Sequence, residues 1–259
     1  MSELTLTRPA SLVGDARVMV GRSVRLSIRN MDALFTALFL PVMLMLLFVY
    51  LFGGAIETGT EYVTYVVPGV ILLCAGFGSS LTAVAVTQDM NGGIMDRFRS
   101  MDIGGAAVLA GHVAASIARN LASTVLVLTV AFLIGFRPQA GPGEWLAAVG
   151  VLLLFVLAFS WVSAAVGLIT RSAEAAGGFT FFVMFLPYPS SAFVPIETMP
   201  SWIHGFAENQ PFTPVIESMR GLLLDVPVGN SPWLAIAWCG GILSVAVAAS
   251  GYLFRRRIR

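Results

Sequence analysis

The chain has 259 residues, of which 57% are hydrophobic and 11% are charged; its formal net charge is +1 and its mean hydropathy is +0.86. This composition lies outside ordinary soluble usage and indicates a membrane protein. The sequence contains no lysine, which excludes a P-loop of the GxxxxGKS/T type and a Schiff-base lysine. The chain therefore cannot bind and hydrolyse ATP by the P-loop route.

The first segment, residues 1–32, is predicted to be a cytoplasmic leader that carries an amphipathic helix. Between residues 9 and 31 the sequence is too polar to span a bilayer, yet a helical wheel places Arg22, Arg25 and Arg29 opposite an apolar stripe of Val13, Ala16, Val20, Val24, Ile28 and Met31, with Arg17 near the apolar side. Such a helix is expected to lie in the membrane interface. The alternative is a solvated basic leader without a fixed structure.

The rest of the chain, residues 33–259, is predicted to form a domain of six transmembrane helices. A helix needs about 20 apolar residues to cross the hydrocarbon layer. The apolar runs that meet this length are near 33–53, 63–86, 109–134, 145–169, 177–196 and 233–254. The fifth run contains Pro187, Pro189 and Pro195, so we expect a kinked or broken helix there.

The arginines predict the orientation of these spans. Twelve of the 15 lie in the leader and in the segments after the second, fourth and sixth runs. The other connections hold only Arg137 and Arg220, and Arg119 is the one charge well inside a span. The positive-inside rule then places both termini in the cytoplasm. Arg119 is either a functional intramembrane charge or a side chain that snorkels to the inner surface.

The connection after the second span, about 90–103, is predicted to hold a short amphipathic helix on the cytoplasmic side. Apolar residues recur there at helical spacing among charged ones, which would offer both kinds of contact to a partner. The residues concerned are Ile94, Met95, Asp96, Arg97, Phe98, Arg99 and Met101. The alternative is an interfacial loop helix that binds no partner.

The outer connection, about 197–232, is predicted to form two short interfacial helices. It is rich in aromatic and aliphatic residues, and Pro200, Pro211 and Pro214 each suit a helix start. We expect both helices to dip into the outer membrane interface.

Catalytic and metal-binding residues are not indicated. His112 and His204 lie on opposite predicted sides of the membrane, so neither a zinc pair nor a histidine relay is predicted, and both are expected to be interfacial polar residues. Cys74 and Cys239 fall inside apolar runs and are expected to be buried free thiols. The spans lack the paired polar groups that a membrane protease or transferase would need.

Three segments resemble one family. GGIMDRFRSM is similar to the coupling-helix region of type-2 ABC exporter permeases, in particular those of the daunorubicin-resistance type. SSAFVPIETMP resembles their stretch at the outer end of span five, and QPFTPVIESMRGLL their asparagine-proline and glutamate-arginine signature. The chain departs from this family at MDIGG, where a proline-containing turn is usual, and at Gln210, where asparagine is commoner.

The resemblance implies a half-transporter of six helices in the bacterial plasma membrane. It would work as a homodimer or heterodimer with two cytoplasmic ATP-binding subunits, which would bind ATP and Mg²⁺, while this chain binds no cofactor and no nucleic acid. The segment around Phe98 would then couple ATP hydrolysis to movement of the spans. The implied cargo is amphipathic or hydrophobic, such as a drug, antibiotic, polyketide or lipid.

The broken fifth span suggests where a substrate path lies. Backbone without helical hydrogen bonds is tolerated at membrane depth only inside protein or beside a water-filled cavity. We therefore expect the fifth span at the centre of a dimer, facing the first or second span. The candidate path residues are Ser79, Ser80, Tyr188, Ser190, Ser191 and Phe193, with ordinary helix packing as the alternative for them.

Two other function classes remain open from the residues alone. A transporter driven by an ion gradient usually needs carboxylates near the bilayer midplane, whereas every aspartate and glutamate here lies at a predicted span end or in a loop. A non-transport membrane assembly protein would need no coupling helix. A neighbouring gene that encodes a P-loop protein would favour the ABC transporter.

Overall fold

The computed structural model describes residues 20–22, 25, 31–56, 58–92, 105–227 and 229–257. Regular structure in this part of the chain is helical and includes no strand, which confirms the all-α class. The elements are α2 (Met31–Leu47), η1 (Phe48–Phe52), α3 (Tyr62–Asn91), α5 (Gly105–Leu133), α6 (Pro142–Ile169), α7 (Ala173–Phe185), η2 (Ile196–Thr198), α8 (Ser201–Asn209), α9 (Phe212–Leu224) and α10 (Ser231–Arg257).

Each predicted span falls on a helix, but the helices differ in length. Within the described residues, four are long and apolar enough to cross a membrane: Tyr62–Asn91, Ala107–Leu133, Pro142–Ile169 and Ser231–Arg256. The first and fifth predicted spans correspond to the shorter apolar helices Phe39–Phe52 and Ala173–Phe185. The six-span count and the membrane side of the termini therefore stay predictions.

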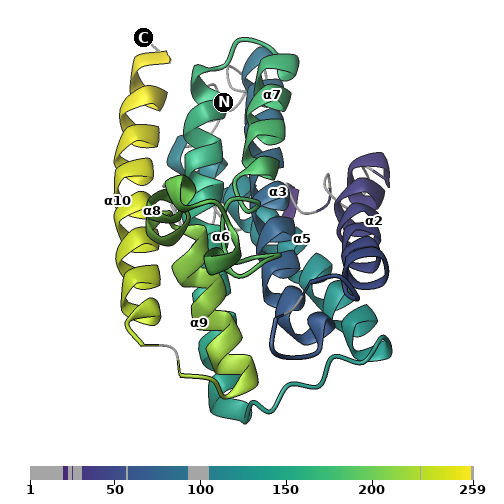
Figure 1. The fold of residues 1–259 in the computed structure, drawn as a ribbon. Coiled ribbons are helices and arrows are strands. Elements are labelled where there is room, and N and C mark those ends of the chain that lie inside the picture. The colour runs from purple at the N-terminus through teal and green to yellow at the C-terminus, as the bar shows by residue number, and fades with distance from the viewer. Residues whose placement is uncertain are drawn as a thin grey trace, which may run out of the picture.

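Helix α3 is the centre of the bundle. It packs against α2, α5, α6, α7 and α9, and 83% of its most apolar window is buried. Small residues allow the close approach of neighbours: a Cβ atom added at Gly69 would lie 2.4 Å from the carbonyl oxygen of Ala192. In contrast, α2 lies at one edge of the bundle and α10 at the opposite edge (Figure 1).

The predicted break in the fifth span is confirmed. Helix α7 begins after Ser172, whose hydroxyl accepts a hydrogen bond from the Ala175 amide at 3.2 Å, and it ends at Phe185. Residues 186–193 continue as turns, and 194 and 195 are also non-helical. Pro187 and Pro189 have no amide hydrogen and cannot extend the α-helical ladder, which accounts for the early end.

The outer connection contains the two expected helices, and Pro200 and Pro211 are their N-caps. Helix α8 exposes Trp202 and Phe206, as an interfacial helix would. Helix α9 is different because most of its residues are buried, and it packs between α3, α6 and α10. Only α8 therefore shows the exposed apolar surface that was expected for both.

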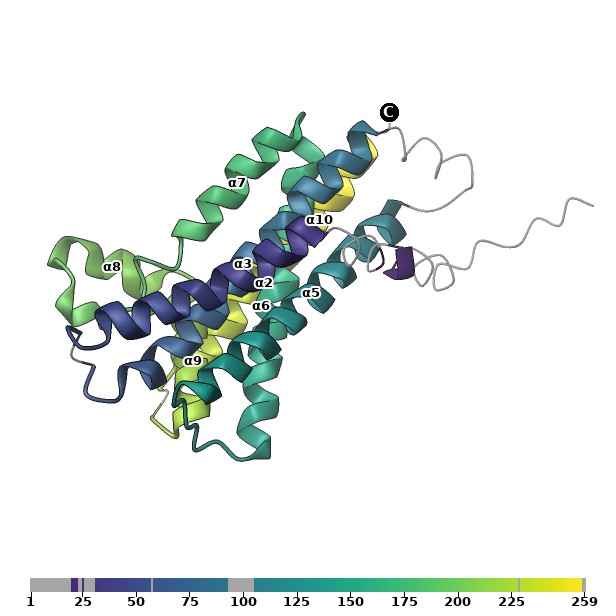
Figure 2. The same cartoon turned by 90° about the vertical axis from the view of Figure 1, so that its right-hand side faces the viewer.

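The two ends of the bundle are distinct. The end of α3, the start of α5 and the end of α10 lie together at one end, while α8 lies at the opposite end (Figure 2). The turn between α6 and α7 also lies at the end that carries the C-terminus (Figure 1). These are the connections that the arginine pattern assigns to the cytoplasm, so we call this end the inner end and the other the outer end.

Candidate functional site

The predicted coupling residues Ile94, Met95, Asp96, Arg97, Phe98, Arg99 and Met101 lie outside the described residues. Their flanks are described, because α3 ends at Asn91 and α5 begins at Gly105. A polar cluster joins these two flanks at the inner end of the bundle. The Nη1 atom of Arg22 donates to Asp89 Oδ2 at 3.0 Å, and Nη2 lies 3.4 Å from Oδ1.

The same carboxylate contacts α5. His112 Nε2 is 3.1 Å from Asp89 Oδ2, and both residues are buried. His112, expected to be an interfacial polar residue, therefore makes a buried contact between the inner ends of α3 and α5. Asp89 thus ties one leader arginine and the start of α5 to the last turns of α3.

The inner end of α3 is also tied to the turn between α6 and α7. The hydroxyls of Thr87 and Thr170 are 2.6 Å apart, and the Asn91 side-chain amide donates to the Arg171 carbonyl at 2.9 Å. With the Asp89 cluster, these bonds form what we call the inner hub: Arg22, Thr87, Asp89, Asn91, His112 and Thr170. The inner hub therefore joins the inner ends of α3, α5 and α6.

A second polar cluster lies in the middle of the bundle, between α3, α5 and α6. Asn120 Nδ2 donates to the Ser116 carbonyl at 2.9 Å and lies 3.3 Å from Ser79 Oγ. The Ser160 hydroxyl of α6 donates to Ser116 Oγ at 2.8 Å. Such bonds stabilise helix contacts in lipid by roughly 0.6–2 kcal/mol each. Sequence reasoning missed Asn120, Ser116 and Ser160, whose only signal was a polar side chain within an apolar run.

Of the candidate path residues, Ser79 belongs to this cluster and Ser80 is the next residue of α3. Both are fully buried, and the Ser80 hydroxyl donates to the Phe77 carbonyl of its own helix at 2.7 Å. In this conformation they act in helix packing, and a role in the path stays a prediction. Arg119 donates to the Gly78 carbonyl at 2.8 Å. Its guanidinium is thus held about 20 Å from the inner end of α3 and does not snorkel.

The outer end of α3 holds the non-helical segment 186–195 in place. The Tyr65 hydroxyl donates to the Ser191 carbonyl and the Tyr62 hydroxyl to the Phe193 carbonyl, each at 3.0 Å. Arg220 Nη2 of α9 donates to the same Ser191 carbonyl at 2.6 Å and to the Tyr65 carbonyl at 3.2 Å. These bonds replace the helical partners that the segment lacks.

Arg220 is the centre of this arrangement. Its guanidinium lies 3.8 Å from the centroid of the Tyr65 ring, and its Nη1 donates to Glu217 Oε1 at 2.6 Å. We call Tyr62, Tyr65, Ser191, Glu217 and Arg220 the outer lock. The family resemblance singled out the glutamate and arginine as a signature without giving them a role. The contacts show that Arg220 fixes α9 to α3 and to the segment after α7, while Glu217 binds the Arg220 guanidinium within α9.

The other candidate path residues lie in or beside the outer lock. Ser190 is fully buried, and its hydroxyl donates to the Pro187 carbonyl. Ser191 and Phe193 are also buried. Phe193 stacks on Phe48 of η1 at a centroid distance of 4.2 Å and on half-buried Tyr188 at 5.1 Å. The broken span therefore contacts the first and second helices of its own chain, and among these four residues only Tyr188 is partly accessible in this conformation. Its place at the centre of a dimer stays a prediction.

In the described part of the chain, no three His, Cys, Asp or Glu side chains come together as a metal site. The arrangement instead consists of polar contacts that hold helices at three depths of the bundle. A family model described as ABC-2 type transporter matches residues 15–224. The chain belongs to the ABC-2 type transporter family. The matched range includes the inner hub, the central cluster and the outer lock.

Named relatives agree with this membership. The ABC-2 transporter chain is 28% identical over 220 residues to a daunorubicin resistance ABC transporter permease protein of Streptomyces coeruleorubidus, covering 84% of this chain and 78% of the relative. It is 24% identical over 222 residues to a probable doxorubicin resistance ABC transporter permease protein of Mycobacterium tuberculosis, covering 85% and 80%. With its apolar helices, this ABC-2 transporter is a multi-pass protein of the bacterial inner membrane.

Proposed function

We propose that the chain is the permease subunit of an ATP-driven exporter, with two permease copies and two separate ATP-binding subunits. The observation that carries the proposal is the family match over residues 15–224 in a chain without lysine. A transporter of this family needs energy, and this chain lacks the P-loop lysine that would hold the ATP phosphates. ATP and Mg²⁺ are therefore assigned to the partner subunit.

The inner hub supports a coupling role for the segment that contains Phe98. This segment leaves α3 just after Asp89 and returns to α5 just before His112, and these two side chains are in contact. Closure of the ATP-binding subunits against the segment would move both helices and shift the dimer between its conformations.

The proposed cargo is amphipathic or hydrophobic. The two relatives are named for resistance to daunorubicin and doxorubicin. The aromatic group of Phe48, Tyr188 and Phe193 at the outer end would suit a planar apolar molecule. The path is proposed to open here, between the fifth span and the first two, when the outer lock releases.

The test is co-expression with an ATP-binding subunit encoded beside this gene, followed by co-purification and measurement of substrate-stimulated ATPase activity. Phe98→Ala should weaken the complex by about 30-fold, since loss of one desolvated aromatic anchor commonly costs about 2 kcal/mol. Phe206→Ala is the matched control, because Phe206 is exposed on α8 at the opposite end of the bundle. Equal association of wild type and Phe98→Ala would contradict the coupling role.

A further inference from the structure

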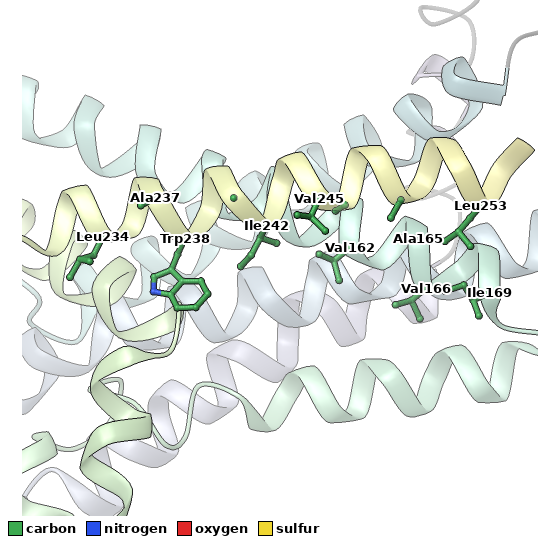
Figure 3. Close-up of a pocket in the computed structure, with 13 residues that line it drawn as sticks. Val162, Ala165, Val166, Ile169, Leu234, Ala237, Trp238, Ile242, Val245 and Leu253 are labelled. Carbon is green, nitrogen blue, oxygen red and sulfur yellow. The ribbon is translucent and has the colours of Figure 1, made fainter.

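An apolar groove runs between α6 and α10 (Figure 3), and α10 lies at the edge of the bundle opposite α2 (Figure 1). Its volume is about 710 Å³. Small residues of α10, such as Ala237, Gly241 and Ala249, leave the space, while Trp238, Val166 and other larger side chains border it. Several bordering residues are exposed, including Ile169 at 62% and Val245 at 70%.

The groove has the length of a membrane. Its lining on α10 extends from Leu234 to Leu253, a distance of about 28 Å at 1.5 Å per residue. The hydrocarbon layer is about 30 Å thick. The half between Ile242 and Leu253 is about 16 Å long, which matches the depth of one lipid leaflet.

Both walls of the groove end in arginines at the inner end of the bundle. Leu253 is followed by Arg255 and Arg256, and Ile169 by Arg171, and all three arginines are exposed. The ion pairs among the described residues use other arginines, namely Arg22 and Arg220. Among the described residues next to these arginines in the chain, the exposed Glu174 is the one carboxylate, so this group of residues carries an excess of positive charge.

We propose that this groove binds one acyl chain of an anionic phospholipid, whose phosphate lies at Arg255, Arg256 and Arg171. The apolar lining separates the bound acyl chain from the neighbouring lipids. The arginines lie beside the phosphate and favour an anionic over a zwitterionic headgroup. A transmembrane helix about 10 Å wide and 28 Å long would fill roughly 2,200 Å³. That is about three times the volume of the groove, so the groove could take only one side of a helix, whereas it can enclose an extended acyl chain.

The proposal is tested on the purified full-length protein by native mass spectrometry. The protein is titrated with phosphatidylglycerol and with phosphatidylcholine of the same acyl chains. Wild type should bind phosphatidylglycerol at least about tenfold more tightly than phosphatidylcholine. The double variant Arg255→Gln/Arg256→Gln should lose about 25-fold in affinity for phosphatidylglycerol, at about fivefold per arginine. Arg137→Gln, which removes an exposed arginine from the connection between α5 and α6, should not change it.

A second pair of variants tests the groove itself. A Cβ atom added at Gly241 or at Gly240 would meet no atom within 4 Å, so we expect both Gly241→Leu and Gly240→Leu to fold. Gly241 lines the groove and Gly240 does not. Gly241→Leu should therefore weaken binding of both lipids by about tenfold or more, because it occupies the space of several methylene groups, and Gly240→Leu should not.

Two results would overturn the proposal. Equal affinity of the wild type for the two lipids would mean that the groove holds only bulk lipid. Efficient disulfide cross-linking of Gly241→Cys between two copies, or between this chain and a membrane partner, would mean that a protein covers the groove.

Discussion

Replacement of Arg220 by methionine should destabilise the protein more than replacement of any exposed arginine. Arg220 donates hydrogen bonds to the carbonyls of Ser191 and Tyr65, and its guanidinium stacks on the Tyr65 ring. A hydrogen bond from a charged group contributes about 1.5–3 kcal/mol and a partly desolvated cation–π contact about 1 kcal/mol. In the variant the Ser191 carbonyl keeps the hydrogen bond from the Tyr65 hydroxyl, so this carbonyl loses only one of its two donors.

The salt bridge to Glu217 adds little, because 37% of the Glu217 side chain is exposed and such pairs contribute about 0–1 kcal/mol. We therefore expect Arg220→Met to lower the free energy of unfolding by about 3 kcal/mol. For a chain of this length that corresponds to a fall of about 6–12 °C in Tm. Thermal unfolding of the detergent-purified protein, followed by tryptophan fluorescence, measures this change.

Arg137→Met is the matched control. Arg137 also donates to two backbone carbonyls, of Phe132 and Phe136, but its side chain is exposed. Its replacement should alter stability by no more than about 0.5 kcal/mol. If the two variants have the same Tm, the outer lock does not hold the segment after α7, and the assignment of Arg220 is wrong.

Three further outcomes are expected. Asp89→Asn should lower stability by about 2 kcal/mol and reduce substrate-stimulated ATPase activity of the reconstituted complex more than its basal activity; unchanged stimulation would separate the inner hub from coupling. Gly78→Ala should lower the free energy of unfolding by about 1–3 kcal/mol, because its Cβ would lie 2.3 Å from the side-chain oxygen of Asn120 on α5. Gly150→Ala, with open space around the added Cβ, should leave stability unchanged or raise it. In intact cells, an impermeant thiol reagent should label a cysteine at Gly141 and not one at Ser172; labelling at Ser172 would reverse the topology.

The sequence predicted those features of the fold that a lipid solvent imposes on any chain. Apolar length located the helices, because unpaired backbone groups are excluded from hydrocarbon. Pro187 and Pro189 indicated the break after α7, since each removes a backbone donor. The two short outer helices were expected, but the burial of α9 was not. Its sequence has an apolar and a polar face like that of α8, and only the contacts in the structure, such as those of Arg220, show that α9 packs inside the bundle.

The site was less predictable because its parts are distant in sequence. Asp89 and His112 flank the predicted coupling segment, yet a single histidine at a span end carries no signal of its partner. Asn120 and Ser116 look like isolated polar residues in an apolar run, and their bonds to α3 and α6 depend on helix rotation. Ser190 and Ser191 were expected to face a path, but both are buried. They lie in a non-helical segment whose backbone carbonyls accept hydrogen bonds from Tyr62, Tyr65 and Arg220.

Pro68 gives α3 unequal stiffness along its length. Its ring nitrogen carries no hydrogen, so the Thr64 carbonyl one turn earlier receives no helical bond from it. The first turn of the helix, which bears Tyr62 and Tyr65, is thus joined to the remainder by one bond fewer than an unbroken helix would have. We therefore expect bending to cost less free energy at this turn than near Asp89, where the helix contains no proline.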